Sequence, residues 1–250
     1  MRILRIPSIA NLALLFAVIV GSAFAQSQAR TFELRIYTAN AGKMTDFQAA
    51  FRTQALPLLA KNGIENLFDG TVLEGARSDG TDAANMLVCI VAHKDRAAAE
   101  KTWAAFDAPT GSLLAKPAYS IFATTTEFSP VLEAPTTGAT NRVFELRKYN
   151  TGEAGLPRMV EEFKSGLAAI LTKQGMTPIF YSTADDHSSF IYLLAHKDRE
   201  AARASWGTFM ADFRPFTAEF NARVPAPPNT GPRTPDDNRF LAPADYSPLR

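Results

Sequence analysis

Cysteine is nearly absent from this sequence of 250 residues, which holds a single one, Cys89. An intramolecular disulfide is therefore excluded, and the fold must depend on the burial of apolar side chains. Cys89 lies within the apolar run MLVCIVA at residues 86–92. We expect it to be a small buried side chain rather than a catalytic thiol, because a cysteine in such a run packs like a small apolar residue.

The motifs that mark several large enzyme classes are also missing. No Gly-x-Gly-x-x-Gly follows a predicted strand, no phosphate-binding Gly-Lys-Ser/Thr occurs, and Gly-x-Ser-x-Gly and His-Glu-x-x-His are absent. Nucleotide-dependent and common hydrolase chemistry are therefore not expected. The chain has only three histidines, and none has a second histidine at ligand spacing, so no metal site is predicted.

Neither sign of charge is in excess. The chain has 26 basic and 25 acidic residues, and its net charge of +1 becomes −1 if Arg2 and Arg5 are removed with an N-terminal signal. A strongly basic surface would be needed to attract nucleic acid or an anionic membrane. Neither is expected as a partner.

The first 25 residues resemble an export signal. Arg2 and Arg5 precede an apolar run from Ile9 to Val20, and Ala23-Phe24-Ala25 forms a small-x-small cleavage site before Gln26. The apolar run is about a dozen residues long, whereas a membrane-spanning helix needs about twenty. We therefore expect residues 1–25 to be a signal peptide, and the mature chain to be periplasmic or secreted without a membrane anchor.

The remaining sequence contains an internal repeat. FELRIY at 32–37 recurs as FELRKY at 144–149, 112 positions later. Three further blocks recur in the same order, which indicates tandem domains. The pairs are 51–64 with 163–176, 92–106 with 195–209, and 126–131 with 244–249.

Each copy has the same predicted order of elements: strand, helix, strand, strand, helix, strand. In the first copy the elements are expected at 32–38, 43–62, 66–74, 86–92, a helix that begins after Asp95, and a strand within 119–128. In the second they are expected at 143–149, 156–174, 177–183, 189–195, 198–213 and 239–245, with a short extra helix at 215–223. Pro57 predicts a bend in the first helix, and Gly63 its end.

This order defines two ferredoxin-like βαββαβ domains in an α+β chain. We place them at residues 31–130 and 142–250, joined by a linker at 131–141, with a proline-rich insertion at 224–237. Such a unit has both helices on one face of its sheet, so the other face needs cover. We expect the two sheets to pack face to face into a pseudo-symmetric barrel within one chain, with a homodimer that pairs domains between chains as the alternative.

The repeated strand carries the candidate site. Because strand side chains alternate between faces, Glu33, Arg35 and Tyr37 share one face, as do their equivalents in the second copy, Glu145, Arg147 and Tyr149. We expect the apolar residues between them to lie beneath the helices and the six polar ones to face the space between the sheets. Two interpretations remain open: a paired structural network, or a cavity in which the arginines and tyrosines bind an anionic or carbonyl-bearing ligand.

A second repeated motif, AHKDR, gives secondary candidates. His93 and His196 lie where a strand ends and a helix follows, a place where an imidazole could act as a base or a metal ligand. The alternative interpretation is a turn in which Asp95 and Asp198 cap the following helices.

The first copy resembles a NIPSNAP domain. The pattern Glu-Leu-Arg-x-Tyr, a Gly-Lys entry to the first helix at Gly42 and Lys43, Leu-Pro at Pro57, and the closing TEFSPV all match. The second copy keeps the Glu-Leu-Arg-x-Tyr pattern but has Ala169 at the Pro57 position, which makes a ligand role of the second copy the less secure one.

The resemblance implies the dimeric α+β barrel superfamily, which includes cofactor-free monooxygenases, haem enzymes and proteins without a known reaction. Three functions stay open. The first is a barrel that binds a small, partly apolar or aromatic ligand in the intersheet cavity without a cofactor. The second is a cofactor-free or haem-handling monooxygenase. The third is a structural or interaction protein, and further association into a homo-oligomer is compatible with each.

Overall fold

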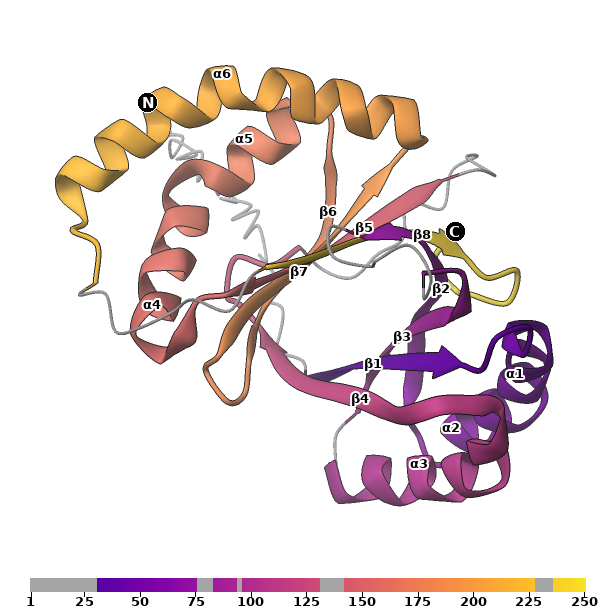
Figure 1. Cartoon of the computed structure of the whole chain (residues 1–250). Coiled ribbons are helices and arrows are strands. Elements are labelled where there is room, and N and C mark those ends of the chain that lie inside the picture. Colours follow the sequence, from indigo (N-terminus) through magenta and orange to yellow (C-terminus); the bar gives the residue numbers. More distant parts are fainter. Residues whose placement is uncertain (1–30, 76–82, 94–95, 131–141, 228–235) are drawn as a thin grey trace, which may run out of the picture.

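A computed structural model describes residues 31–75, 83–93, 96–130, 142–227 and 236–250. The predicted signal peptide, the linker, Asp95 and most of the proline-rich insertion lie outside these residues. Figure 1 shows a central barrel of strands with one group of helices on each side. The predicted α+β class and the pairing of the two halves within one chain are both confirmed.

The elements of the two copies agree closely with the repeat. The first copy consists of β1 (Thr31–Ala39), α1 (Met44–Ala50), α2 (Leu56–Lys61), β2 (Glu65–Gly75), β3 (Met86–Ala92), α3 (Arg96–Thr110) and β4 (Leu114–Thr125). The second consists of β5 (Val143–Asn150), α4 (Gly152–Glu162), α5 (Ala168–Lys173), β6 (Thr177–Ala184), β7 (Ser189–His196), α6 (Arg199–Arg223) and β8 (Asp237–Pro243).

The first helix of each copy contains a π-helical turn, at Phe51–Ala55 and at Phe163–Leu167. The first of these turns lies where Pro57 predicted a bend. The second occurs although Ala169 replaces the proline, so proline alone does not cause the distortion. Both turns begin with a fully buried phenylalanine, which indicates that packing against the sheet holds the extra residue in place.

Helix α6 differs from the expectation of two separate helices. It runs unbroken from Arg199 to Arg223, with Pro215 inside it. Asp198 caps its start as predicted, since its carboxylate accepts a hydrogen bond from the Ala201 amide at 2.7 Å. The C-terminal half of α6 has no counterpart in α3, which ends at Thr110. No helix among the described residues has the length and apolarity needed to cross a membrane.

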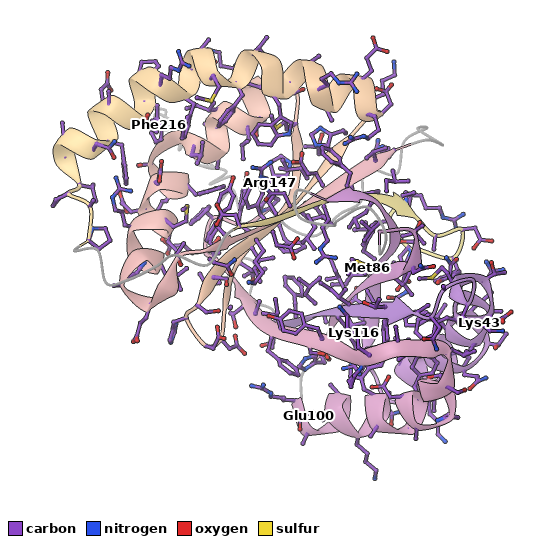
Figure 2. The ribbon with its side chains drawn as sticks, viewed as in Figure 1. Lys43, Met86, Glu100, Lys116, Arg147 and Phe216 are labelled. Carbon is purple, nitrogen blue, oxygen red and sulfur yellow. The ribbon has the colours of Figure 1, made fainter. Side chains whose placement is uncertain are left out.

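The eight strands form one closed antiparallel barrel in the order β1-β3-β2-β8-β5-β7-β6-β4. The halves join at two seams, where β2 pairs with β8 and β4 pairs with β6. Side chains fill the space between the two sheets (Figure 2). Because the sheets close on each other, neither half is left with an open edge.

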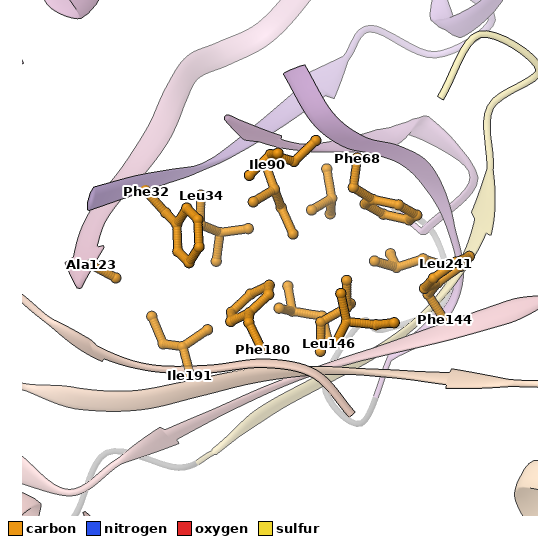
Figure 3. Close-up of a cluster of buried hydrophobic side chains, with 14 of the residues drawn as sticks. Phe32, Leu34, Phe68, Ile90, Ala123, Phe144, Leu146, Phe180, Ile191 and Leu241 are labelled. Carbon is orange, nitrogen blue, oxygen red and sulfur yellow. The ribbon is translucent and has the colours of Figure 1, made fainter. Parts of the chain in front are cut away.

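The barrel interior is mostly apolar, and this corrects the expected assignment of strand faces. Phe32, Leu34 and Ile36 lie in the interior cluster, and Phe144 and Leu146 belong to its other side, on the second sheet (Figure 3). Two equivalent ring pairs cross between the halves, Phe32–Phe180 at 5.2 Å and Phe68–Phe144 at 4.8 Å between centroids. The Glu-Arg-Tyr side chains point the other way, toward the helices.

The physical reason is that both faces of each sheet are buried, so apolar alternation alone cannot tell them apart. The middle of the interior offers only apolar side chains, where a charged group would have no partner. Charged residues on this face lie toward one end of the barrel, where Lys148 is opposite Asp237 and Arg239 pairs with Asp237 at 2.7 Å. The helices instead bring groups that can pair with the polar set, including the indole N–H of Trp103 and the carboxylate of Asp107. The face with polar partners therefore receives the polar side chains.

The closing Ser-Pro segment of each half also accepts a hydrogen bond from the other half. The Ser129 hydroxyl, after β4, accepts a hydrogen bond from the Tyr181 amide of β6 at 3.0 Å. The Ser247 hydroxyl, after β8, accepts one from the Asp69 amide of β2, also at 3.0 Å. Both hydroxyls are buried, and both contacts cross between the copies. This reciprocal contact explains why the Ser-Pro block recurs in the sequence.

Asp69 is a fully buried carboxyl group beneath the closing segment, and burial raises its pKa to about 6 although the Asn66 side chain donates to it at 2.6 Å. Since an unfolded aspartate titrates near ~3.9, the folded state binds the extra proton between these pH values. Stability should therefore be greatest below pH 4 for this group and fall as the pH rises to about 6, by roughly 3 kcal/mol. Asp69→Asn should remove that loss, as urea unfolding at pH 4.5 and 7.5 would show.

Asp212→Asn, at a half-buried position, is the matched control, because Lys173 lowers the pKa of Asp212 instead of raising it. A variant at Asp69 with the same pH dependence of unfolding as the wild type would contradict the assignment.

Candidate functional site

The Glu-Arg-Tyr set of the first copy forms a closed polar network under α3. Arg35 donates to Tyr37 at 2.7 Å, to Glu33 at 3.1 Å and to the Ser120 hydroxyl at 2.8 Å, and its Nη2 pairs with Asp107. Glu33 also accepts from the indole of Trp103 and from Ser120, both at 2.6 Å. Every hydrogen-bonding nitrogen of the guanidinium group is therefore occupied within the protein.

The second copy repeats the core of this network. Arg147 donates to Glu145 at 2.6 Å and to the Tyr149 hydroxyl at 3.1 Å, and the Trp206 indole donates to Glu145 at 2.7 Å. His196 makes a further contact of 3.0 Å with Glu145. Burial acts to raise the pKa of Glu145, but these donors and the Arg147 charge outweigh it, so the pKa lies below its usual value. Glu145 therefore stays ionised and holds the arginine.

The two networks differ at the outer edge of the arginine. Met210 occupies the α6 position that corresponds to Asp107 in α3, and Asn238 replaces Ser120 on the neighbouring strand. Arg147 Nη2 consequently makes no hydrogen bond with any residue that the structure describes. Figure 2 labels Arg147 in the half of the molecule that α4, α5 and α6 cover.

A pocket of about 390 Å³ lies at this edge, between the second sheet and its helices. Its volume is within the range of small-molecule sites. Most of its wall is apolar or aromatic, while the polar lining comes from three charged side chains and two tyrosines. The lining residues are Arg147, Tyr149, Met159, Glu162, Leu167, Leu171, Tyr192, Trp206, Phe209, Met210, Phe213 and Asp236.

Substitutions between the copies explain why space exists here. In the first copy Phe47 is fully buried against Tyr37, at 4.9 Å between ring centroids. Its counterpart is Met159, which leaves the Tyr149 ring partly exposed. Side chains therefore cover the first network, whereas the second network borders the pocket on one side.

The long helix α6 completes the wall of the pocket. Its second half packs on α4, where Arg158 bonds Asn221 and lies over the Phe220 ring at 4.8 Å. Gly166 permits this approach, because a Cβ atom there would lie 2.6 Å from the Phe216 ring. Phe216 is labelled on α6 in Figure 2.

The two tyrosines of the pocket are joined, with their hydroxyl oxygens 2.8 Å apart. Tyr192 replaces Cys89 of the first copy, and burial raises its pKa well above the ordinary value. The charge of Arg147 opposes that rise without cancelling it. The Tyr192 phenol is therefore neutral, and its hydrogen bond with Tyr149 helps to hold the hydroxyl group that accepts from Arg147.

The predicted site residues divide into three groups. Arg147 and Tyr149 line the pocket, with Glu145 directly behind them. Their first-copy equivalents Glu33, Arg35 and Tyr37 form the closed network. His93 is buried against the Phe122 ring, and His196 contacts Glu145, so neither histidine lines the pocket.

Two expectations about the cavity need correction. It does not lie between the sheets, because apolar side chains fill that space. It belongs to the second copy, which the loss of the Leu-Pro match had made the less secure candidate. Glu162 and the α6 wall were missed by the sequence analysis, although the mismatch of Ala50 with Glu162 and of Asp107 with Met210 in the aligned repeat marks both.

The lining gives a poor fit for haem. Haem iron takes an axial histidine, cysteine or tyrosine, or a methionine together with a histidine. The described lining has no histidine or cysteine, and both tyrosine hydroxyls are engaged in hydrogen bonds. Among the described residues there is also no cluster of three metal-binding side chains of the histidine, cysteine or carboxylate type.

Comparisons with known proteins identify the fold. A candidate monooxygenase from Fusobacterium nucleatum subsp. nucleatum ATCC 25586 superposes with a TM-score of 0.58 at 10% identity, over 86% of this chain and 92% of that one. An anthrone oxidase-like protein gives a TM-score of 0.54 at 9% identity, over 86% and 91%. The chain therefore has the dimeric α+β barrel fold, with both halves in one polypeptide.

The narrower NIPSNAP resemblance stays a prediction. An uncharacterised NIPSNAP domain protein from Burkholderia xenovorans matches over 40% of this chain and 98% of its own, at 19% identity and a TM-score of 0.28. No protein-family model matches the sequence. No curated protein matches it either.

The difference between the two arginines can be tested by exchanging their outer partners. Phenylglyoxal should modify Arg147 in the wild-type protein and spare Arg35. Met210→Asp should supply the missing ion pair and slow labelling of Arg147 by about tenfold or more, since a hydrogen bond to a charged group contributes ~1.5–3 kcal/mol. Peptide mass spectrometry after timed labelling measures both sites at once.

Asp107→Met is the reciprocal variant and should expose Arg35, while Met210→Leu controls for the loss of methionine. Equal labelling of Arg147 in the wild type and Met210→Asp would show that the edge of Arg147 is not open as described.

Proposed function

We propose that this protein binds a small, partly apolar or aromatic molecule in the pocket between the second sheet and α4–α6. An anionic or carbonyl oxygen of the ligand would accept hydrogen bonds from Arg147. The observation that carries the proposal is the unused Nη2 of Arg147 on the wall of a 390 Å³ pocket. In the first copy the same atom is satisfied by Asp107.

The remaining lining supports this assignment. Trp206 lies under the guanidinium group at 4.3 Å, and Glu145 and Tyr149 hold it from behind. The arginine is therefore oriented before a ligand arrives, which lowers the entropic cost of binding. The apolar wall of Met159, Phe209 and other residues would cover the body of the ligand.

The structural or interaction hypothesis is supported by the filled barrel interior but not by the pocket. A protein that needed only a stable barrel would gain nothing from an arginine with an unpaired guanidinium nitrogen. The first copy shows that the same motif can pair all of these nitrogens within the protein. The polar network of the first copy fits a structural role, and that of the second fits a ligand-binding one. The duplicated motif therefore has two roles in one chain.

Arg147→Met tests the proposal by removing the charge while keeping most of the side-chain length. The Kd for 3-phenylpropionate, chosen as an aromatic carboxylate of suitable size, should rise about 10- to 100-fold, the factor that a charge-assisted hydrogen bond supplies. Isothermal titration calorimetry of the full chain measures this. Mass spectrometry of small molecules retained during purification gives an unbiased second readout.

Arg35→Met is the matched control, since it changes the same motif in the copy without this pocket. It should lower stability, because Glu33 and Asp107 lose their partner, and leave the Kd unchanged. An Arg147→Met protein that retained wild-type affinity and the same bound molecules would refute the proposal.

A second candidate is cofactor-free oxygenation of a phenolic or enolisable substrate in the same pocket. It would use Arg147 to stabilise an enolate or phenolate oxygen, as an oxyanion donor does. The apolar aromatic wall and the similarity in fold to the anthrone oxidase-like protein motivate this candidate. For anthrone, the ring methylene would lose two hydrogens and gain one oxygen atom from O₂, and the other oxygen atom would leave as water.

Oxygen uptake distinguishes catalysis from binding alone. If the protein is such an oxygenase, it should consume O₂ with anthrone faster than buffer does, and Arg147→Met should lower that rate at least tenfold, as the loss of an oxyanion donor typically does. An oxygen electrode with quinone analysis measures the reaction. A rate equal to spontaneous oxidation would leave the binding function only.

A further inference from the structure

Glu162 is a second polar group in the pocket that the binding of an anion does not use. It lies at the end of α4 and is only 8% exposed. Its carboxylate makes no hydrogen bond with any described residue, and its charged neighbour is Arg158, with Nη1 3.8 Å from Oε2. That distance is too long for a hydrogen bond.

Arg158 is directed elsewhere, because it bonds Asn221 and stacks over Phe220 on α6. Glu162 is thus left as a nearly buried acceptor at an apolar wall. Burial raises the pKa of this carboxyl group, and the charge of Arg158 opposes the rise. A nearly buried carboxylate without a hydrogen-bond partner is costly even beside a charged neighbour, so such groups usually have a function or an unseen partner.

The first copy again provides the comparison. The residue that corresponds to Glu162 is Ala50, where no carboxylate exists. The second copy therefore has no counterpart of Asp107, the acid that pairs with the arginine in the first copy. It has Glu162 instead, on a different wall of the pocket. The other acidic lining residue, Asp236, accepts a hydrogen bond from the Asn150 amide at 3.1 Å, so its carboxylate is already used.

We infer that the ligand is bifunctional: it carries an anionic or carbonyl oxygen for Arg147 and a hydrogen-bond donor, a hydroxyl or an amine, for Glu162. An aromatic or apolar body joins the two groups and packs on Met159 and Phe209. Hydroxyaryl acids and their amine analogues are the simplest compounds of this class. The inference rests on the proposed function of the same pocket and narrows its ligand class.

The test uses matched probes and calorimetry on the full chain. The probes are phenyl-, 4-hydroxyphenyl- and 4-aminomethylphenyl-alkanoates with acetate, propionate and butyrate chains, because the series varies the separation of the two groups. At one chain length the wild type should bind a donor-bearing probe at least about tenfold more tightly than the unsubstituted one, as expected when a donor pairs with a carboxylate.

Variants at Glu162 then identify the acceptor. Glu162→Leu should abolish the preference for the donor-bearing probe. Glu162→Gln keeps a carbonyl acceptor, so it should retain a preference for the hydroxyl and lose one for the ammonium group. Glu161→Leu is the matched control on the neighbouring exposed position and should retain every preference. Thermal unfolding checks that each variant is folded.

The outcomes separate this inference from the proposed function. Binding that depends on Arg147 but shows no preference for a donor at any chain length would overturn the inference and leave the proposed function intact. A preference that survives Glu162→Leu would also overturn it. If no probe binds and no small molecule is retained on purification, both are rejected.

Discussion

The structure depends on one constraint: each sheet is buried on both faces, so its polar side chains must find partners within the protein. The barrel interior meets the constraint mostly by being apolar, with Phe32, Phe144 and their neighbours packed between the sheets, and at one end by pairing Arg239 with Asp237. The outer faces meet it through ion pairs and indole hydrogen bonds beneath α3 and α6. A charged side chain without such a partner would cost more than its burial could return.

Duplication allowed the two copies to satisfy this constraint differently. In the first, Asp107 completes the shell around Arg35, and the network is purely internal. In the second, Met210 stands at the corresponding place, Met159 replaces a packed phenylalanine, and a longer α6 walls off the space above the sheet. The same motif is thus a structural network in one half and a candidate binding site in the other. Neither half forms a complete structure alone, because each covers the interior face of the other's sheet. Each half also donates a hydrogen bond to the closing Ser-Pro segment of the other.

Much of the fold could be predicted because it follows from local patterns. The repeat fixed the order of elements, alternation located the strands to within a few residues, and the bare faces of two βαββαβ units required a barrel. The orientation of the strand faces could not be predicted, because Phe32 and Tyr37 are both fully covered. Likewise the unbroken α6 depends on its packing against α4, which outweighs the local effect of Pro215.

The sequence by itself determined the duplicated architecture and the pairing of glutamate, arginine and tyrosine, since both arise from spacing along the chain and the alternation of a strand. Only the tertiary structure decided which arginine is open. That outcome depends on Asp107 and Met210, which lie 72 and 63 positions from the arginines they flank and come close to them only when the helices dock on the sheets. The pocket is a property of this docking, because each of its walls comes from a different element.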